Sequence, residues 1–106
     1  STPFEFSELF SLGGKVKKVD AKTISFETQI APNPKPEIRK AIITKDTAIT
    51  KFEITKTGEK ISGRESKIKL SDIRTGDTIV AAANENIKDK KIFTATKIQI
   101  LVPLSI

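Results

Sequence analysis

The chain has 106 residues, of which 37% are hydrophobic and 30% charged, so it is long enough for one globular domain and its composition excludes a disordered chain. The formal net charge of +6 favours an anionic partner, but 16 of the 19 basic residues are lysines, which lack the planar guanidinium fork that reads bases. Neither His nor Cys is present, which excludes disulfides, thiolate chemistry, the usual ligand sets for zinc, iron and copper, and the commonest general base near neutral pH.

The first 12 residues form a Phe-rich segment. Phe6, Leu9 and Phe10 have the spacing of one helical face. Because several exposed Phe side chains are unfavourable in a soluble monomer, we interpret this segment as a plug over one open end of a sheet or barrel. A juxtamembrane or partner-docking segment is the alternative. The predicted organisation is therefore an N-terminal cap at 1–12 and a β-barrel domain at 13–106.

Two strands that form a hairpin follow the cap. Residues 15–19 make the first strand, in which Val16 and Val19 are three residues apart and cannot share a face of a regular strand. This spacing predicts a β-bulge. Residues 23–28 alternate apolar and polar side chains, which predicts a second strand with Phe26 facing inward.

The middle of the chain alternates loops with strands. Three prolines in residues 29–36 remove ladder donors, which predicts an extended, polyproline-like connection. Residues 37–44, with Ile38 near the start, form a third predicted strand, and residues 47–55 form a fourth. Residues 56–67 are polar and contain two glycines, which predicts the longest mobile loop of the chain.

Residues 69–83 predict a one-turn helix that leads into a central strand. Ser71 is a good N-cap, because its hydroxyl can accept from a backbone N–H of the first turn. Gly76 can adopt the left-handed conformation that ends the turn, and Ile73 should lie under the sheet. Residues 78–83 form an apolar run typical of a buried fifth strand.

The last predicted strand determines the expected architecture. Residues 84–91 form a polar hairpin loop, and residues 92–101 form a strand whose apolar positions change parity, which predicts a second bulge near 96–97. About six short strands with polar turns and two bulges predict a small closed antiparallel OB-like barrel with a one-turn helix before strand five. A β-sandwich is the alternative architecture.

Turn and core residues recur in a recognisable order along residues 13–101. The matching motifs are Gly14-x-Val16-x-x-Val19, Thr23-Ile24-x-Phe26, Asp46-Thr47-x-Ile49, Leu70-x-Asp72-Ile73-x-x-Gly76-Asp77-x-Ile79-x-Ala81 and Ala95-x-x-Ile98-x-Ile100. The pattern resembles a family of small bacterial domains of unknown function that occur in secreted or lipid-anchored proteins and are predicted to be OB-like barrels. The resemblance implies the fold and an extracytoplasmic or secreted location, and it supplies no catalytic residues.

The first residue is Ser1 instead of Met, so we expect a trimmed or mature chain, with anchoring through a removed N-terminal segment as an open alternative. No apolar run approaches the roughly 20 residues that a membrane helix needs. We therefore expect no transmembrane segment in this chain.

Candidate sites for chemistry are sparse in the sequence. The two carboxylates of Asp72 and Asp77 are better explained by a helix start and a turn than by acid–base catalysis. The pair Ser66-Lys67 lies in the predicted loop, where a catalytic lysine would need burial. The sequence therefore predicts no catalytic, cofactor-binding or metal-binding residues.

An anionic ligand is the remaining possibility for the basic residues. The candidate anion contacts are Lys15, Lys17, Lys18, Arg39 and Lys40. OB barrels bind single-stranded nucleic acid by stacking bases on outward aromatic side chains, but the chain has no Tyr or Trp. We therefore expect no specific nucleic-acid binding.

These observations lead to one expected function and one alternative. We expect a non-catalytic extracytoplasmic binding or scaffolding module without a cofactor, whose partner is an envelope protein, a glycan or a polyanion. The alternative is an OB-like domain that binds nucleic acid or another polyanion weakly and without sequence preference.

Overall fold

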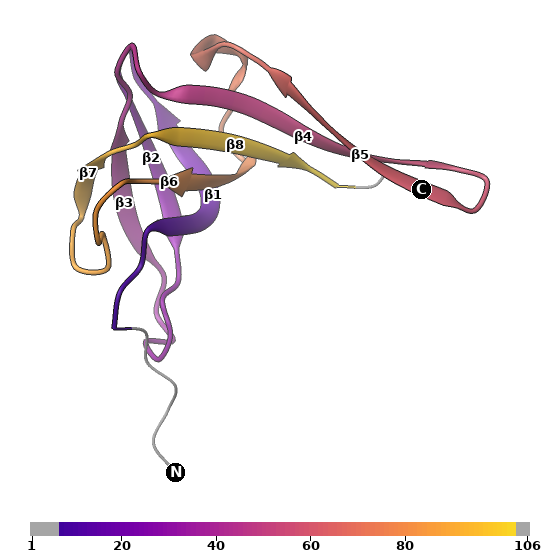
Figure 1. The fold of residues 1–106 in the computed structure, drawn as a ribbon. Coiled ribbons are helices and arrows are strands. Elements are labelled where there is room, and N and C mark those ends of the chain that lie inside the picture. The colour runs from indigo at the N-terminus through magenta and orange to yellow at the C-terminus, as the bar shows by residue number, and fades with distance from the viewer. Residues whose placement is uncertain (1–6, 104–106) are drawn as a thin grey trace.

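A computed structural model describes residues 7–103 as one mixed β-sheet (Figure 1). Its elements are β1 (Ser11–Val19), β2 (Thr23–Thr28), β3 (Glu37–Ile42), β4 (Ala48–Thr57), β5 (Lys60–Lys67), a 3-10 turn η1 (Leu70–Asp72), β6 (Thr78–Ala82), β7 (Ile92–Thr94) and β8 (Lys97–Val102). The strand order is β5-β4-β8-β6-β1-β2-β3-β7. The β3–β7 and β4–β8 pairs are parallel, and the other pairs are antiparallel.

The all-β class predicted from the sequence is confirmed. The number of strands is eight instead of about six, and the paired order runs from β5 at one end to β7 at the other. The prediction of a purely antiparallel sheet is wrong, because β7 and β8 run parallel to β3 and β4.

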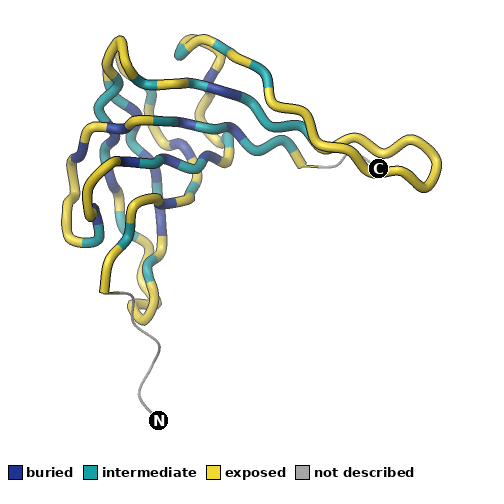
Figure 2. Tube along the Cα trace, in the orientation of Figure 1, coloured by how far each residue is buried: buried dark blue, intermediate teal, exposed yellow. Residues whose placement is uncertain are grey.

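Alternating side chains of the central strands form the hydrophobic core (Figure 2). The rings of Phe26 and Phe93 meet edge to face, with centroids 6.2 Å apart and planes at 85°. This geometry is favourable for aromatic pairs beyond the burial of their surface. The buried apolar residues are Leu12, Val16, Ile24, Phe26, Ala41, Ile73, Ile79, Ala81, Ala83, Ile87, Phe93, Ala95, Ile98 and Ile100.

The first predicted bulge is present, but the predicted second bulge is wrong, because the last segment is two strands with different partners and not one bulged strand. In β1 the pairing with β2 shifts between Val16 and Lys18, so Lys17 is the extra residue of a bulge. The last strand is interrupted at 95–96, where β7 ends and β8 begins. There the N–H of Ala95 donates to the carbonyl oxygen of Ile42, and the N–H of Thr96 donates to that of Ala82. The break between β7 and β8 therefore explains why the apolar positions of segment 92–101 change parity.

The turn before β6 is capped differently from the prediction. Ser71 lies inside η1, so its predicted role as N-cap is wrong. Instead, the carboxylate of Asp72 accepts a 2.9 Å hydrogen bond from the backbone N–H of Lys69, the residue that precedes the turn. A carboxylate satisfies an unpaired N–H here as well as a hydroxyl would. Ile73 is buried beneath the sheet, as predicted.

A second turn follows and leads into β6. Gly76 has φ +95°, the left-handed conformation predicted for it. The carboxylate of Asp77 accepts a 2.8 Å hydrogen bond from the N–H of Arg74. The backbone of Val16 bonds to this turn on both sides, with its carbonyl accepting from Gly76 and its N–H donating to Asp77. The two carboxylates are thus turn residues, as the sequence indicated.

Residues 56–67 are not a loop, and this prediction is wrong. They form the end of β4, a two-residue turn at Gly58 and Glu59, and β5. Gly58 has φ +64° at the first turn position, which is the position that Gly favours in tight hairpins. Thr57 and Lys60 close the turn as a pair. The polar composition of this segment indicates solvent exposure, but an exposed ribbon is as polar as a loop.

In β3 the apolar Ile38 faces solvent and the charged Arg39 faces the interior, which is the reverse of what their polarity suggests. Ile38 is 49% exposed, whereas Arg39 is only 3% exposed. A turn closed by the N–H of Asn33 and the carbonyl of Ile30 interrupts the preceding Pro-rich connection, so that connection is not fully extended.

The N-terminal cap is described only from residue 7 onward, and Phe6 lies outside the described residues. Phe10 is 49% exposed, while Leu9 packs against the core. The carbonyl of Leu9 accepts a 2.7 Å hydrogen bond from the N–H of Ile87. Strand β1 begins at Ser11, before the predicted boundary at 12–13.

Candidate binding surface

Part of the β4–β5 hairpin projects from the body of the domain (Figure 1). Strand β4 pairs with both β5 and β8 as far as Glu53. From Ile54 onward its partner within the described part of the chain is β5 alone. We call residues 54–63, which include the turn, the arm. Its residues are exposed along their whole length (Figure 2).

One face of the arm carries its apolar side chains, with Lys56 opposite Ile61 as the charged residue of that face, and the other face is polar. Residues that lie directly opposite each other on paired strands share a face. Ile54 lies opposite Gly63. Phe52 lies on the same face of β4, two residues closer to the body of the domain. On the other face, Thr55 lies opposite Ser62 and their hydroxyls are 3.0 Å apart. This alternation gives the two faces of the ribbon different polarity.

The ring of Phe52 packs against Gly63, where a side chain would leave it no room. A Cβ atom at Gly63 would overlap the ring atoms of Phe52. The aromatic ring thus covers the glycine of the neighbouring strand, an arrangement that pins the register of strand pairs. The Phe52 ring also adds an aromatic side chain to the apolar face where the arm joins the body.

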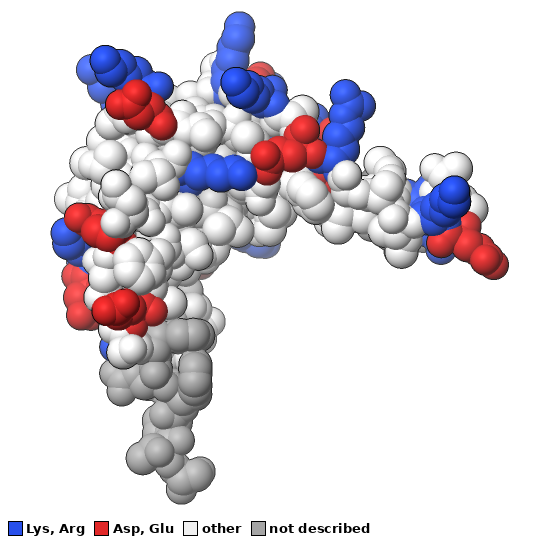
Figure 3. Space-filling view, viewed as in Figure 1, with Lys and Arg blue, Asp and Glu red and all other residues white. Residues whose placement is uncertain are grey.

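A hollow of about 410 Å³ lies where the arm joins the body. It is lined by Phe52, Ile54, Thr78, Leu101, Val102 and Pro103. These residues are almost all apolar, and ligand sites are usually concave and apolar with few polar groups. Figure 3 shows uncharged surface along the arm between the charged side chains at its base and those near its tip.

A polar cluster fixes the base of the arm beside the hollow. The carboxylate of Glu65 accepts a 3.0 Å hydrogen bond from Nζ of Lys97 and another from the side-chain amide of Gln99. These contacts link β5 to β8 across β4. The arm is therefore anchored at its base and free at its tip.

Four of the five predicted anion contacts lie at the surface. Lys15, Lys17 and Lys18 are exposed, and Lys40 is half-buried. Lys18 and Lys40 both lie opposite Ser25, so the three residues form one row on the outer face of β1, β2 and β3. Lys15 lies opposite Glu27, which lowers the positive charge of the next row, and Lys18 is 3.8 Å from Asp20.

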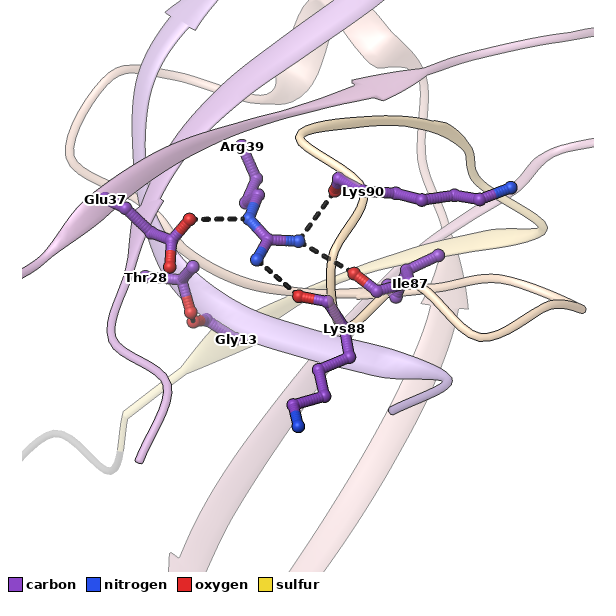
Figure 4. Close-up of polar contacts among 7 residues, drawn as sticks. All are labelled: Gly13, Thr28, Glu37, Arg39, Ile87, Lys88 and Lys90. Carbon is purple, nitrogen blue, oxygen red and sulfur yellow. Dashed lines mark hydrogen bonds and ion pairs between the residues drawn. The ribbon is translucent and has the colours of Figure 1, made fainter. Parts of the chain in front are cut away.

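Arg39 is not a surface contact, because its guanidinium is committed inside the domain (Figure 4). Its Nη1 atom donates to the carbonyl oxygens of Ile87 and Lys90 at 2.7 and 2.6 Å, and its Nη2 atom donates to that of Lys88 at 2.6 Å. Its Nε atom donates to the carboxylate of Glu37 at 2.9 Å. Arg39 thus holds the 84–91 connection against β3. The 260 Å³ hollow beside it has mixed charge.

The structure bears on two arrangements considered from the sequence, a metal site and the Ser66–Lys67 pair. No group of three or more Asp or Glu side chains in residues 7–103 is placed to hold a metal ion. Ser66 and Lys67 are consecutive residues of β5, so their side chains point to opposite faces of the strand. No helix among the described residues is long and apolar enough to cross a membrane.

Sequence reasoning missed the arm and the hollow. The signal was the alternation Phe52-x-Ile54 followed by Ile61-x-Gly63, which has the period of a strand. The glycines and charges of the segment obscured it. Comparison of the chain with protein-family models, curated proteins and solved structures finds no match.

Proposed function

We propose that the protein is a non-catalytic binding module that docks a partner polypeptide on the apolar face of the arm and in the hollow at its base. The observation that carries this proposal is the exposure of two isoleucines on a projecting ribbon. Ile54 is 39% exposed and Ile61 is 66% exposed. Exposed apolar surface next to an apolar hollow is typical of protein-interaction sites.

The geometry favours a polypeptide over a polyanion as the partner. The hollow is lined mainly by apolar side chains, which offer little to a phosphate or sulfate group. The lysine row on β1, β2 and β3 lacks aromatic side chains, and the next row contains the half-buried Glu27 opposite Lys15. Lysines without a stacking surface support only weak, salt-sensitive contact with a polyanion.

The proposal includes the finer fold expected from the sequence, an OB-like barrel as the body that carries the arm. Two consecutive residues support it. Ala95 donates its N–H to Ile42 at the end of β3, and Thr96 donates its N–H to Ala82 at the end of β6. Segment 92–102 therefore links the β3 side of the sheet to the β6 side. Closure through this segment would leave the arm as an extension of the barrel wall.

We also propose the extracytoplasmic location that the family resemblance implies. The resemblance depends on turn and core residues, and several of these have the structural roles that the motifs require. Gly76 has a positive φ, and Val16, Phe26 and Ile79 are fully buried.

Selection of a displayed library of random peptides against the chain tests the proposed function. We expect wild-type protein to enrich ligands that no longer bind the Ile54→Glu variant. The matched control is Ile38→Glu, because Ile38 is similarly exposed but lies on β3, away from the arm. Ligands that are lost equally with both variants, or with neither, would contradict docking on the arm. Circular dichroism of each variant establishes that the fold is intact.

A further inference from the structure

Strand β5 presents a long free edge. Among residues 7–103 it pairs only with β4, and it stands at one end of the strand order. The register with β4 is regular over eight consecutive pairs, from Thr50↔Lys67 to Thr57↔Lys60. The strand has no proline and no bulge. Proteins usually shorten, bend or cover such edges, because unpaired backbone groups are a template for another strand.

The hairpin register identifies which backbone groups are free. In a two-residue hairpin the residues that flank the turn form a hydrogen-bonded pair, so Lys60 bonds to Thr57. Hydrogen-bonded residues then alternate along the strand, and the N–H of Ile68 indeed donates to Ile49. The backbone groups that point away from β4 belong to Ile61, Gly63, Glu65 and Lys67.

The free edge carries unbalanced positive charge. Among residues 7–103, the side chains of Lys60, Arg64 and Lys67 form no hydrogen bond or ion pair. The acidic residue of the strand, Glu65, is already bound to Lys97 and Gln99. Arg64 lies opposite Glu53, but the carboxylate of Glu53 is paired with Lys51 at 3.2 Å.

This charge determines which kind of strand can be added. A second copy of the chain would bring two β5 edges together and place like charges beside one another, at a cost in free energy. An acidic segment would place carboxylates beside Lys60 and Arg64, which share the polar face of the ribbon. Apolar side chains on its other face would continue the surface formed by Ile61 and Gly63.

We propose that the free edge of β5 receives an extended acidic segment of the partner polypeptide as an additional strand. Backbone hydrogen bonds to β5 supply affinity, and the charges supply selectivity, as in other cases of strand addition. Alternate side chains of the added strand lie beside Ile61 and Gly63 and widen the apolar face of the arm, with β5 and β4 between the added strand and the hollow. This inference rests on the proposed docking function and specifies its geometry and the chemistry of the partner.

The test uses a fluorescein-labelled, end-capped peptide as long as β5, in which Glu alternates with Val and Thr. We expect anisotropy to show binding that is lost when Lys replaces Glu or when the backbone is N-methylated throughout. The Arg64→Glu variant should bind about tenfold more weakly, because it reverses a charge at the contact. Lys17→Glu, the same change in net charge on β1, should bind like wild type.

Amide hydrogen exchange on the complex gives a readout specific to strand addition. Peptide binding should slow exchange at Ile61, Gly63 and Glu65, whose N–H groups are free. It should leave Ser62 and Arg64 unchanged, because their N–H groups already bond to β4.

Three outcomes would overturn the strand-addition inference: no binding of the acidic peptide, equal binding of its N-methylated form, or equal weakening by Lys17→Glu and Arg64→Glu. Binding that Ile54→Glu weakens but that adds no protection to β5 would also overturn it. That last result would leave docking on the apolar face standing. Loss of the docking function itself is detected separately, by the displayed library.

Discussion

Nη1 of Arg39 on β3 donates a 2.7 Å hydrogen bond to the carbonyl oxygen of Ile87, a residue that lies in a connection and is nevertheless fully buried. The guanidinium satisfies three carbonyl groups of this connection and one carboxylate. Backbone carbonyls buried without a partner are costly, so this single side chain allows an irregular segment to close over the core.

Arg39→Met should therefore lower the free energy of unfolding by about 2–4 kcal/mol, because the carbonyls of the 84–91 connection lose their donors. Arg64→Met is the matched control, since Arg64 is exposed, and its effect should stay within about 0.5 kcal/mol. Urea denaturation of both variants measures the difference. Equal midpoints would mean that Arg39 does not hold this connection.

The two adjacent glycines of β1 should respond differently to substitution by alanine. A Cβ atom at Gly14 would overlap the carbonyl oxygen of Glu27, whereas a Cβ at Gly13 would meet no atom closer than 3.6 Å. Gly14→Ala should cost at least about 2 kcal/mol, because backbone must move. Gly13→Ala should change stability by less than about 1 kcal/mol. Thermal denaturation separates the two, and similar melting temperatures would contradict the β1–β2 packing.

Replacing an isoleucine by alanine should destabilise the domain much more in the core than on the arm. Ile79 is fully buried, and Ile79→Ala should cost about 2–5 kcal/mol from lost burial and the cavity left behind. Ile61→Ala should cost less than about 0.5 kcal/mol, because its side chain is exposed. Denaturant midpoints for both variants decide this. A large loss of stability at Ile61 would show that the arm serves folding instead of binding.

The lysine row should give only weak binding of nucleic acid. Anisotropy with a labelled single-stranded oligonucleotide should show no saturation at low micromolar protein in physiological salt, because nonspecific phosphate contacts give a Kd of about 10⁻⁴–10⁻⁶ M. Heparin should compete for whatever binding remains at low salt. Submicromolar binding that resists salt and prefers one sequence would contradict the proposed function and favour the nucleic-acid alternative.

Local sequence patterns predicted most of the strands but not the placement of single polar residues. Residues 23–28 alternate cleanly and form β2 with the predicted bounds, and the spacing of Val16 and Val19 located a bulge. Arg39 was predicted as a candidate anion contact, which requires an exposed side chain, and charged side chains are seldom buried. Its burial depends on carbonyl groups some 50 positions along the chain, and no local pattern contains that information.

The candidate surface was hidden for a related reason. The polar arm and a mobile loop have the same composition, and only pairing between β4 and β5 distinguishes them. The hollow brings together residues of β4 and β8 with Thr78 of β6, so its existence depends on the parallel β4–β8 pair. A strand that pairs in parallel with a distant segment leaves no turn signal in the sequence.

The most direct test of docking on the arm is a map of isoleucine methyl groups by NMR during titration with a peptide from the displayed library. Ile54 and Ile61 report on the arm, while Ile38 and Ile92 are exposed reporters elsewhere on the sheet. We predict that the methyl signals of Ile54 and Ile61 shift on binding and that those of Ile38 and Ile92 do not. Shifts at Ile38 or Ile92 with Ile54 and Ile61 unchanged would contradict the proposed binding surface.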